Sequence, residues 1–380
     1  DMTLRDLNTI ISLVPQPYRK TNVFLGGHSL GAFIAQNYAA YDFGGDPTTT
    51  TNAGFNNIAG VILLDGGGSG LLQPITETQY FTTGVTASIS GFSYIMPSVN
   101  GLKTDPSSVM VVSLLGPLFG PQFLNMFTFV QIEGMYALLE PNQVSTLLQV
   151  PDFKLIAATM LGNTEFKATN QAMLGFGMDH NFNPIGMFHV TLGSANGPLT
   201  STTSLLISGE TVLQPTDKGT MTYTWNSQNH ITHIMDLAAA LSNTYTAMTE
   251  RYFPTRLGLD SFILAGYGPT QTTDWRYEQA GIHVIHTHQM DAPVLAFGGG
   301  SGVERTADLY YQYRDLIAPA RTCSNQPRAV CGFDIHIMPN YTHVDVLLSD
   351  PTLSNDNVDA TIYNWIMSNT GGNMPAPVLP

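Results

Sequence analysis

Residues 23–32, VFLGGHSLGA, place a short apolar run directly before the pattern G-x-S-x-G at residues 27–31. In such a stretch a buried strand turns sharply into a helix, and the serine at the tip is held in a strained backbone conformation. We expect glycine at Gly27 and Gly31 because a Cβ there would collide with the neighbouring strand or the helix. The stretch therefore predicts a reactive hydroxyl at Ser29.

The residues around the pattern favour a strand followed by a helix. Val23–Leu25 is apolar without interruption, as fully buried parallel strands are. After the serine, small residues recur at Ala32, Ala35 and Ala39, and these allow a helix to lie close against a sheet. The alternative is a turn rich in glycine and serine that has no chemistry.

The composition limits the class of protein. The chain has 380 residues, of which 43% are hydrophobic and 11% are charged, so it can bury a large core. The net charge of -14 argues against nucleic acid or an anionic membrane surface as the main partner. No apolar run approaches the roughly 20 residues that span a bilayer, and the first ten residues do not resemble a signal peptide. We therefore expect no integral membrane segment.

The two cysteines bear on the location of the protein. Cys323 and Cys331 lie close together in a polar loop, where they form either a local disulfide or two thiols. Few lysines and many Thr, Asn, Ser and Gly residues favour export, as a disulfide would. We expect a secreted protein, either extracellular or periplasmic.

The order of elements predicts an α/β protein in three parts. Apolar strands are expected at 61–64, 292–300 and 333–338, and helices at 2–13, 304–317 and 358–367. Residues 1–70 and 286–380 form the two parts of one core, and 71–285 form a large, mainly helical insertion rich in Phe and Met. These Phe and Met side chains either adapt to apolar ligands or pack as the insertion's own core.

Together these features resemble the α/β-hydrolase superfamily, in particular secreted lipase- and esterase-like members with a large cap or lid. GHSLG at 27–31 and YTHVD at 341–345 are similar to the family's nucleophile and histidine positions, in the family's order. The resemblance covers about 1–70 and 286–370. It implies a mostly parallel sheet flanked by helices, with the cap inserted after the strand that ends at residue 64.

The resemblance implies a role for each matching residue. Ser29 is the nucleophile, His343 the general base, and the Leu30 N–H one oxyanion donor. The acid is Asp65, at the end of the strand after the serine, with Glu304 or another carboxylate as the alternatives.

Several other polar residues receive no catalytic role. Asp345 is expected to support the histidine loop, and the histidines at 28, 283, 286 and 288 are expected to be packing, surface or pocket residues. The spacing of the histidines within 283–291 matches no recognised metal pattern, so no metal or cofactor is predicted.

A second oxyanion donor normally comes from a loop after an earlier strand, which this sequence does not contain. We therefore expect an N-terminal fragment of the same precursor as a partner. The expected activity is cleavage of carboxylic esters of apolar small molecules or polymers, as in a lipase, esterase or polyester depolymerase. The alternatives are an acyltransferase, or a non-catalytic extracellular binding or structural protein that retains the fold.

Overall fold

The chain folds into two compact units. The computed structural model describes residues 1–69, 77, 123–184, 189–204, 211–242, 261, 273–317, 332–353 and 358–371. Unit 1 comprises Asp1–Thr86, Pro254–Pro339 and Asn357–Pro380, and unit 2 comprises Ala87–Phe253 and Asn340–Asp356. Cys323 and Cys331 lie outside the described residues.

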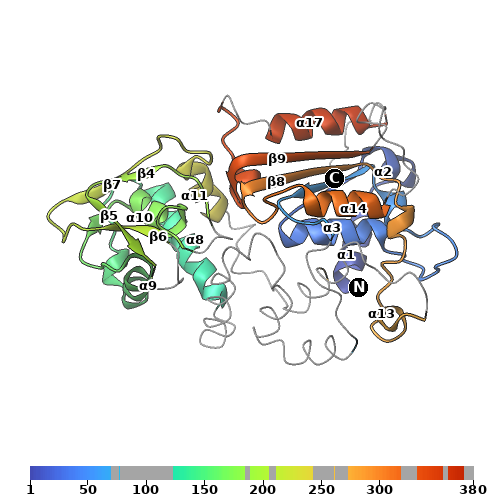
Figure 1. Ribbon diagram of the computed structural model, residues 1–380, viewed down its shortest axis with the longest axis horizontal. Coiled ribbons are helices and arrows are strands. Elements are labelled where there is room, and N and C mark those ends of the chain that lie inside the picture. The colour runs from blue at the N-terminus through green and yellow to red at the C-terminus, as the bar shows by residue number, and fades with distance from the viewer. Residues whose placement is uncertain are drawn as a thin grey trace. The chain divides into compact units, whose positions relative to one another are not determined.

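Unit 1 is a mixed α/β structure built on a mostly parallel sheet (Figure 1). Its described strands have the spatial order β1 (Phe24–His28), β2 (Gly60–Leu64), β8 (Val294–Ser301) and β9 (Phe333–Thr342). β1 and β8 both pair with β2 in parallel. β9 runs in the direction of β8, since Gly332 bonds Val294 near both starts and Pro339 approaches Gly300 near both ends.

Burial differs along this sheet. All of β2 except Leu64 is buried, and so is most of β8, because helices cover both faces. β1 is half-buried, and Gly26 at its centre is exposed, because β1 is the edge strand of the described sheet. The sequence predicted a fully buried strand at 23–25. A strand is present, but the expectation that it is fully buried is wrong.

Helices lie on both faces of the sheet in unit 1. Figure 1 shows α17 on one face and α3 and α14 on the other. Ala32, Ala35 and Ala39 of α3 are all buried, which lets this helix approach β1 and β2 closely. The helices are α1 (Met2–Ile11), α2 (Gln16–Asn22), α3 (Leu30–Ala40), η1 (Gly54–Asn57), α13 (Trp275–Glu278), η7 (Thr287–Gln289), α14 (Asp308–Ile317) and α17 (Val358–Asn369).

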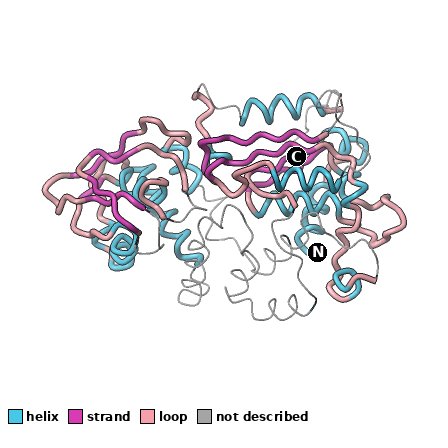
Figure 2. Tube along the Cα trace, viewed as in Figure 1, coloured by secondary structure: helices cyan, strands magenta, loops and turns pink. Residues whose placement is uncertain are grey.

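Unit 2 combines helices with short strands, drawn in cyan and magenta in Figure 2. Its described helices are α8 (Phe123–Leu139), η3 (Leu147–Gln149), α9 (Pro151–Leu161), α10 (Asn170–Met178), α11 (Ile234–Ser242) and α16 (Asp345–Leu348). Its strands are β3 (Lys167–Ala168), β4 (Ser194–Asn196), β5 (Leu199–Thr203), β6 (Thr211–Pro215) and β7 (Thr222–Asn226), in sheets of order β3-β7-β4 and β5-β6. The sequence interpretation of a mainly helical segment did not anticipate these strands.

The aromatic and sulfur-containing side chains of unit 2 form its own core. Phe176, Phe182, Tyr223 and Trp225 are buried together with edge-to-face and tilted ring contacts, and Met173 joins the same cluster. The sequence left open whether the Phe and Met residues adapt to apolar ligands or pack as the core of the insertion. The residues of this cluster pack as a core.

Residues 340–356, which include His343, cluster with unit 2, although the sequence interpretation grouped them with 286–380. Specific polar contacts account for this. The His230 Nε2 lies 3.0 Å from Asp350 Oδ2, and the Asp350 N–H donates to the Ile231 carbonyl at 2.7 Å. These bonds attach the chain after β9 to the segment before α11.

One buried carboxyl in unit 2 makes its stability depend on pH. Glu133 of α8 lies against Gly177 of α10, and burial raises the pKa of its carboxyl to about 8. The folded state therefore retains a proton that the unfolded chain releases near pH 4.5. The stability of unit 2 should fall as pH rises from about 4.5 to about 8 and change little from this group outside that window.

We expect Glu133→Gln to remove this dependence. The variant should match the wild type near pH 4.5 and be more stable by on the order of a few kcal/mol near pH 8, because the amide has no charge to desolvate. Urea unfolding at several pH values measures the difference. Glu165→Gln, at an exposed position of the same unit, is the matched control. A gain for Glu133→Gln that is equal at all pH values would contradict the assignment.

Candidate functional site

Ser29 occupies a strained backbone conformation between β1 and α3. Its φ is 55° and its ψ is -122°, a region that residues with a side chain rarely adopt. The Ser29 N–H donates to the Leu64 carbonyl at 3.0 Å, and its own carbonyl accepts the Ala32 N–H at 3.1 Å at the start of α3. The side chain is partly exposed. The predicted sharp turn with the serine at its tip is confirmed.

The two glycines of the pattern have different roles. A Cβ on Gly27 would overlap the carbonyl group of Gly31, so strand and helix can meet here only because residue 27 has no side chain. A Cβ on Gly31 would meet no atom within 4 Å. The expectation that a side chain at Gly31 would collide is therefore wrong, because its Cβ direction points away from the contact that Gly27 makes.

The N-terminus of α3 lies directly at Ser29. Leu30 is the first residue of the helix, and its N–H has no acceptor among the residues that the structure describes. A free N–H at the positive end of a helix dipole stabilises negative charge that develops nearby. Leu30 therefore has the position that an oxyanion donor requires.

Asp65 lies at the C-terminal end of β2 and is fully buried, with a φ of 42°. Its Oδ1 accepts the N–H groups of Gly299 and Glu304, both at 2.9 Å, and its Oδ2 accepts the Val303 N–H at 2.8 Å. A Cβ on Gly302 would overlap this carboxylate. Asp65 thus fixes the turn after β8 through these three N–H groups.

Glu304 is a second buried carboxyl beside Asp65, with 1% of its surface exposed. Neither of its carboxyl oxygens has a hydrogen-bond partner within the described ranges. Burial, and then the negative charge of Asp65, raise the pKa of the Glu304 carboxyl well above its usual range. Ser29 follows β1, Asp65 follows β2 and Glu304 follows β8, so these residues lie at the edge of the unit 1 sheet where its parallel strands end.

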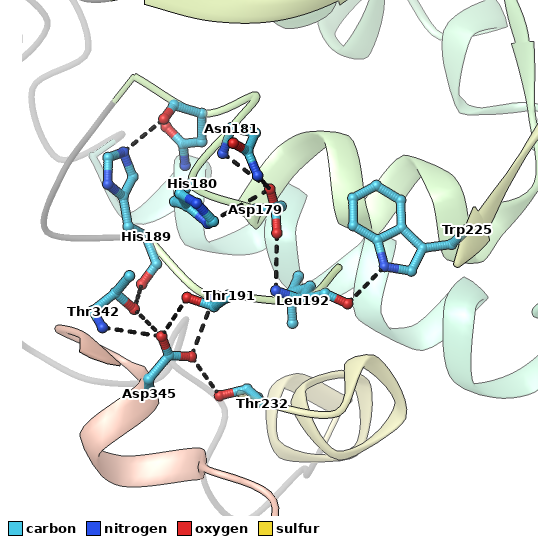
Figure 3. A network of polar contacts seen from close by, with 11 residues as sticks. Asp179, His180, Asn181, His189, Thr191, Leu192, Trp225, Thr232, Thr342 and Asp345 are labelled. Carbon is cyan, nitrogen blue, oxygen red and sulfur yellow. Dashed lines mark hydrogen bonds and ion pairs between the residues drawn. The ribbon is translucent and has the colours of Figure 1, made fainter. Parts of the chain in front are cut away.

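His343 lies in unit 2, just after β9, and is 3% exposed. Figure 3 shows how Asp345, two residues later, is held. Its Oδ1 accepts the Thr191 N–H at 3.0 Å and the Thr232 hydroxyl at 2.7 Å, and its Oδ2 accepts the Thr342 N–H at 3.0 Å. Asp345 therefore fixes the loop that carries His343, which is the role expected of it.

The remaining histidines make pairings of their own. The His286 Nε2 lies 2.8 Å from Asp42 Oδ2, and both residues are buried. His283 packs between the rings of Tyr41 and Tyr277. No group of three or more His, Cys, Asp or Glu residues in the described part of the chain could hold a metal ion.

Two residues of this region were missed by sequence reasoning. The Gly66 backbone packs on Ser29, since a Cβ on Gly66 would overlap the Ser29 carbonyl. The fully buried Tyr310 hydroxyl lies 2.8 Å from the Phe297 carbonyl and 3.3 Å from the Gly66 nitrogen. The run of glycines after Asp65 indicates a close backbone approach there and could have identified Gly66. Tyr310 could not have been identified, because in the sequence it is simply one apolar residue of an expected helix.

The sequence was compared with models of known protein families and with curated proteins. No protein-family model matches the sequence, and no curated protein matches it at a significant level. Among the residues that the structure describes, no helix combines the length and the hydrophobicity that crossing a membrane requires.

The contact at Gly27 yields a matched pair of variants. Gly27→Ala should destabilise unit 1 by about 3 kcal/mol, because the new methyl group overlaps backbone that cannot move away. Gly31→Ala should change stability by at most about 1 kcal/mol, since its methyl group meets open space within a helix. Thermal and urea unfolding measure both effects. Equal losses in the two variants would show that the approach at Gly27 is not what fixes the turn.

Proposed function

We propose that the protein is a serine hydrolase that cleaves carboxylic esters of apolar substrates through an acyl-enzyme. The observation that carries the proposal is the conformation of Ser29, whose φ is 55° directly before the N-terminus of α3. A serine is held in this costly conformation only where surrounding contacts impose it, and such strain is concentrated at functional sites. The adjacent Leu30 N–H supports the same chemistry, because acyl transfer develops an oxyanion.

Each proposed residue has one task in the reaction. His343 removes the proton of the Ser29 hydroxyl as the Ser29 Oγ attacks the acyl carbon, and the Leu30 N–H stabilises the oxyanion. His343 then gives that proton to the leaving alcohol as its C–O bond breaks. In the second half His343 removes a proton from water as its oxygen attacks the acyl carbon. His343 then returns this proton to the Ser29 Oγ as the bond between Oγ and the acyl carbon breaks, which releases the carboxylic acid and restores the serine. The acid, Asp65, stabilises the histidine when it is protonated.

The surroundings of the two carboxyl groups favour Asp65 over Glu304 as the acid. The raised pKa of Glu304 means that its carboxyl group holds its proton more tightly than an ordinary glutamate, and a protonated carboxyl group stabilises a protonated histidine poorly. Asp65, by contrast, accepts three backbone N–H groups, and such donors favour an ionised carboxylate.

Exposed apolar side chains in unit 2 support an apolar substrate. Met135, Leu138 and Leu139 near the end of α8 are exposed, as is Leu155 of α9. Such side chains bind acyl chains or apolar alcohols by removing apolar surface from water. An acyltransferase would use the same residues with an acceptor other than water, so the acceptor is part of what the experiment must identify.

A fluorophosphonate probe tests the proposal directly. We expect the probe to label Ser29 covalently, Ser29→Ala to abolish labelling, and His343→Gln to slow it by a factor of about a thousand or more, because the base is lost. Peptide mapping identifies the labelled residue, and p-nitrophenyl esters of increasing acyl length measure turnover. Folded protein without label on Ser29 would indicate a non-catalytic binding or structural role.

A second pair of variants assigns the acid. Asp65→Asn should reduce turnover by a factor of about ten thousand, because the amide neither carries a charge nor orients the histidine. Glu304→Gln should retain turnover, since an amide of similar shape replaces a carboxyl group whose pKa is raised and whose charged form is disfavoured. Circular dichroism confirms that each variant is folded before the rates are compared. Loss of turnover in Glu304→Gln alone would assign the acid to Glu304.

A further inference from the structure

The strain at Ser29 requires contacts that keep its backbone from relaxing. A residue with a side chain in this region of φ and ψ is destabilised relative to ordinary conformations, so neighbouring backbone must occupy the space into which it would relax. Two contacts of the Ser29 backbone come from the end of β2 and the turn that follows. The Leu64 carbonyl accepts the Ser29 N–H, and Gly66 packs against the Ser29 carbonyl.

Residues 65–69, here called the 65–69 turn, are themselves in an unusual conformation. Asp65, Gly67 and Gly68 have φ angles of 42°, 85° and 79°. All five residues of the turn are buried. A turn of this kind is not fixed by its own sequence, because glycine accepts many conformations, and it therefore depends on side chains from elsewhere.

Side chains and backbone from two helices hold the ends of the 65–69 turn. The Gln36 side chain of α3 donates to the Gly68 carbonyl at 3.0 Å, and the Ser69 N–H donates to the Leu309 carbonyl of α14 at 3.0 Å. At Gly66 itself, the Tyr310 hydroxyl is the one described side-chain group that forms hydrogen bonds. Tyr310 is therefore the contact nearest to the point where the turn meets Ser29.

The Tyr310 hydroxyl joins two strand ends. It accepts the Gly66 N–H at 3.3 Å, and its own proton has two carbonyl oxygens within reach, that of Phe297 at 2.8 Å and that of Gly66 at 3.2 Å. Tyr310 is fully buried, so water does not compete for these bonds. The hydroxyl thus fixes Gly66 relative to β8, which lies on the other side of β2 from β1.

The ionisable groups around Tyr310 keep its hydroxyl protonated. Burial, and then the negative charges of Glu304 and Asp65, raise the pKa of the Tyr310 hydroxyl well above its usual range. The hydroxyl therefore holds its proton tightly, and this proton is available for the bond to the Phe297 carbonyl.

We propose that Tyr310 is a positioning residue for the nucleophile: its hydroxyl fixes Gly66, and Gly66 fixes the backbone of Ser29. The catalytic part of this inference rests on the proposed function, because only a reactive serine needs such placement. The structural part, that Tyr310 holds the Ser29 backbone, stands on the contacts alone. Tyr310 does not touch the reacting atoms in this scheme.

Tyr310→Phe tests the proposal, with Tyr313→Phe as the matched control. Tyr313 lies on the same helix and is equally buried, but its hydroxyl bonds the Met290 sulfur at 3.2 Å, away from the 65–69 turn. The full-length protein is labelled with a fluorophosphonate, and the maximal labelling rate and the half-saturating concentration are measured separately, well below the unfolding temperature. Hydrogen exchange of the Ser29 and Gly66 amides is followed by mass spectrometry in the same three proteins.

We expect Tyr310→Phe to reduce the maximal labelling rate by between about tenfold and a hundredfold, as displacement of a reacting atom by up to about 1 Å does. The half-saturating concentration should stay unchanged, and the Ser29 and Gly66 amides should exchange faster. Tyr313→Phe should match the wild type in all of these measurements.

The failures of the two ideas can be told apart. Wild-type protein that does not label would contradict the proposed function, and the exchange of the Ser29 amide would still decide whether Tyr310 holds its backbone. Labelling of Tyr310→Phe at the wild-type rate would overturn the positioning role. Unchanged exchange at Ser29, or equal effects in Tyr310→Phe and Tyr313→Phe, would overturn it as well.

Discussion

A serine at φ 55° and ψ -122° keeps its conformation only when the structure around it prevents relaxation. In unit 1, contacts on both sides of Ser29 prevent it. On one side, α3 follows so closely after β1 that residue 27 can only be glycine. On the other side, the end of β2 supplies an acceptor for the Ser29 N–H and then turns so that Gly66 covers its carbonyl. The strain is thus balanced by backbone contacts on both sides of the serine.

The carboxylate of Asp65 extends this arrangement to the next strand. One N–H group from Gly299 of β8 and two from residues just after β8 converge on it, and the absence of a side chain at Gly302 leaves room for it. A buried carboxylate is stable only when its oxygens are satisfied in this way. The carboxyl oxygens of Glu304 have no such partners among the described residues, and burial raises the pKa of this group. Two neighbouring buried carboxyl groups therefore differ in how well their charged forms are stabilised, because their hydrogen-bond partners differ.

Local sequence patterns predicted the elements of unit 1 closely, because each element has an apolar face or run of its own. The strand expected at 61–64 is Gly60–Leu64, and the helix expected at 358–367 is Val358–Asn369. The helix expected from Glu304 begins only at Asp308, since the N–H groups of residues 303 and 304 donate to Asp65 instead. That contact is far away in sequence, so no local pattern reveals it.

The same limit applies to the candidate site. The turn at Ser29 was predictable because glycine, serine and glycine at this fixed spacing indicate a local turn. The hydrogen bonds of Tyr310 and the raised pKa of Glu304, by contrast, arise from tertiary packing. The short strands of unit 2 were missed because they have two to five residues and alternate weakly. The roles of His343 and Asp65, the secreted location, the Cys323–Cys331 disulfide and a bound N-terminal fragment stay predictions.

The bonds between Asp65 and the chain after β8 also bear on how the protein folds. Asp65 and Gly299 are 234 positions apart, so their contact closes a very long loop and carries a large entropic cost before it forms. Contacts of this kind slow folding and form after local ones. The parallel pairing of β1 with β2 needs only the first part of the chain, but the bonds from Asp65 to Gly299 and from Gly66 to Tyr310 form only when β8 and α14 arrive. The conformation of Ser29 is therefore completed among the last steps of folding, after the whole intervening segment has been synthesised.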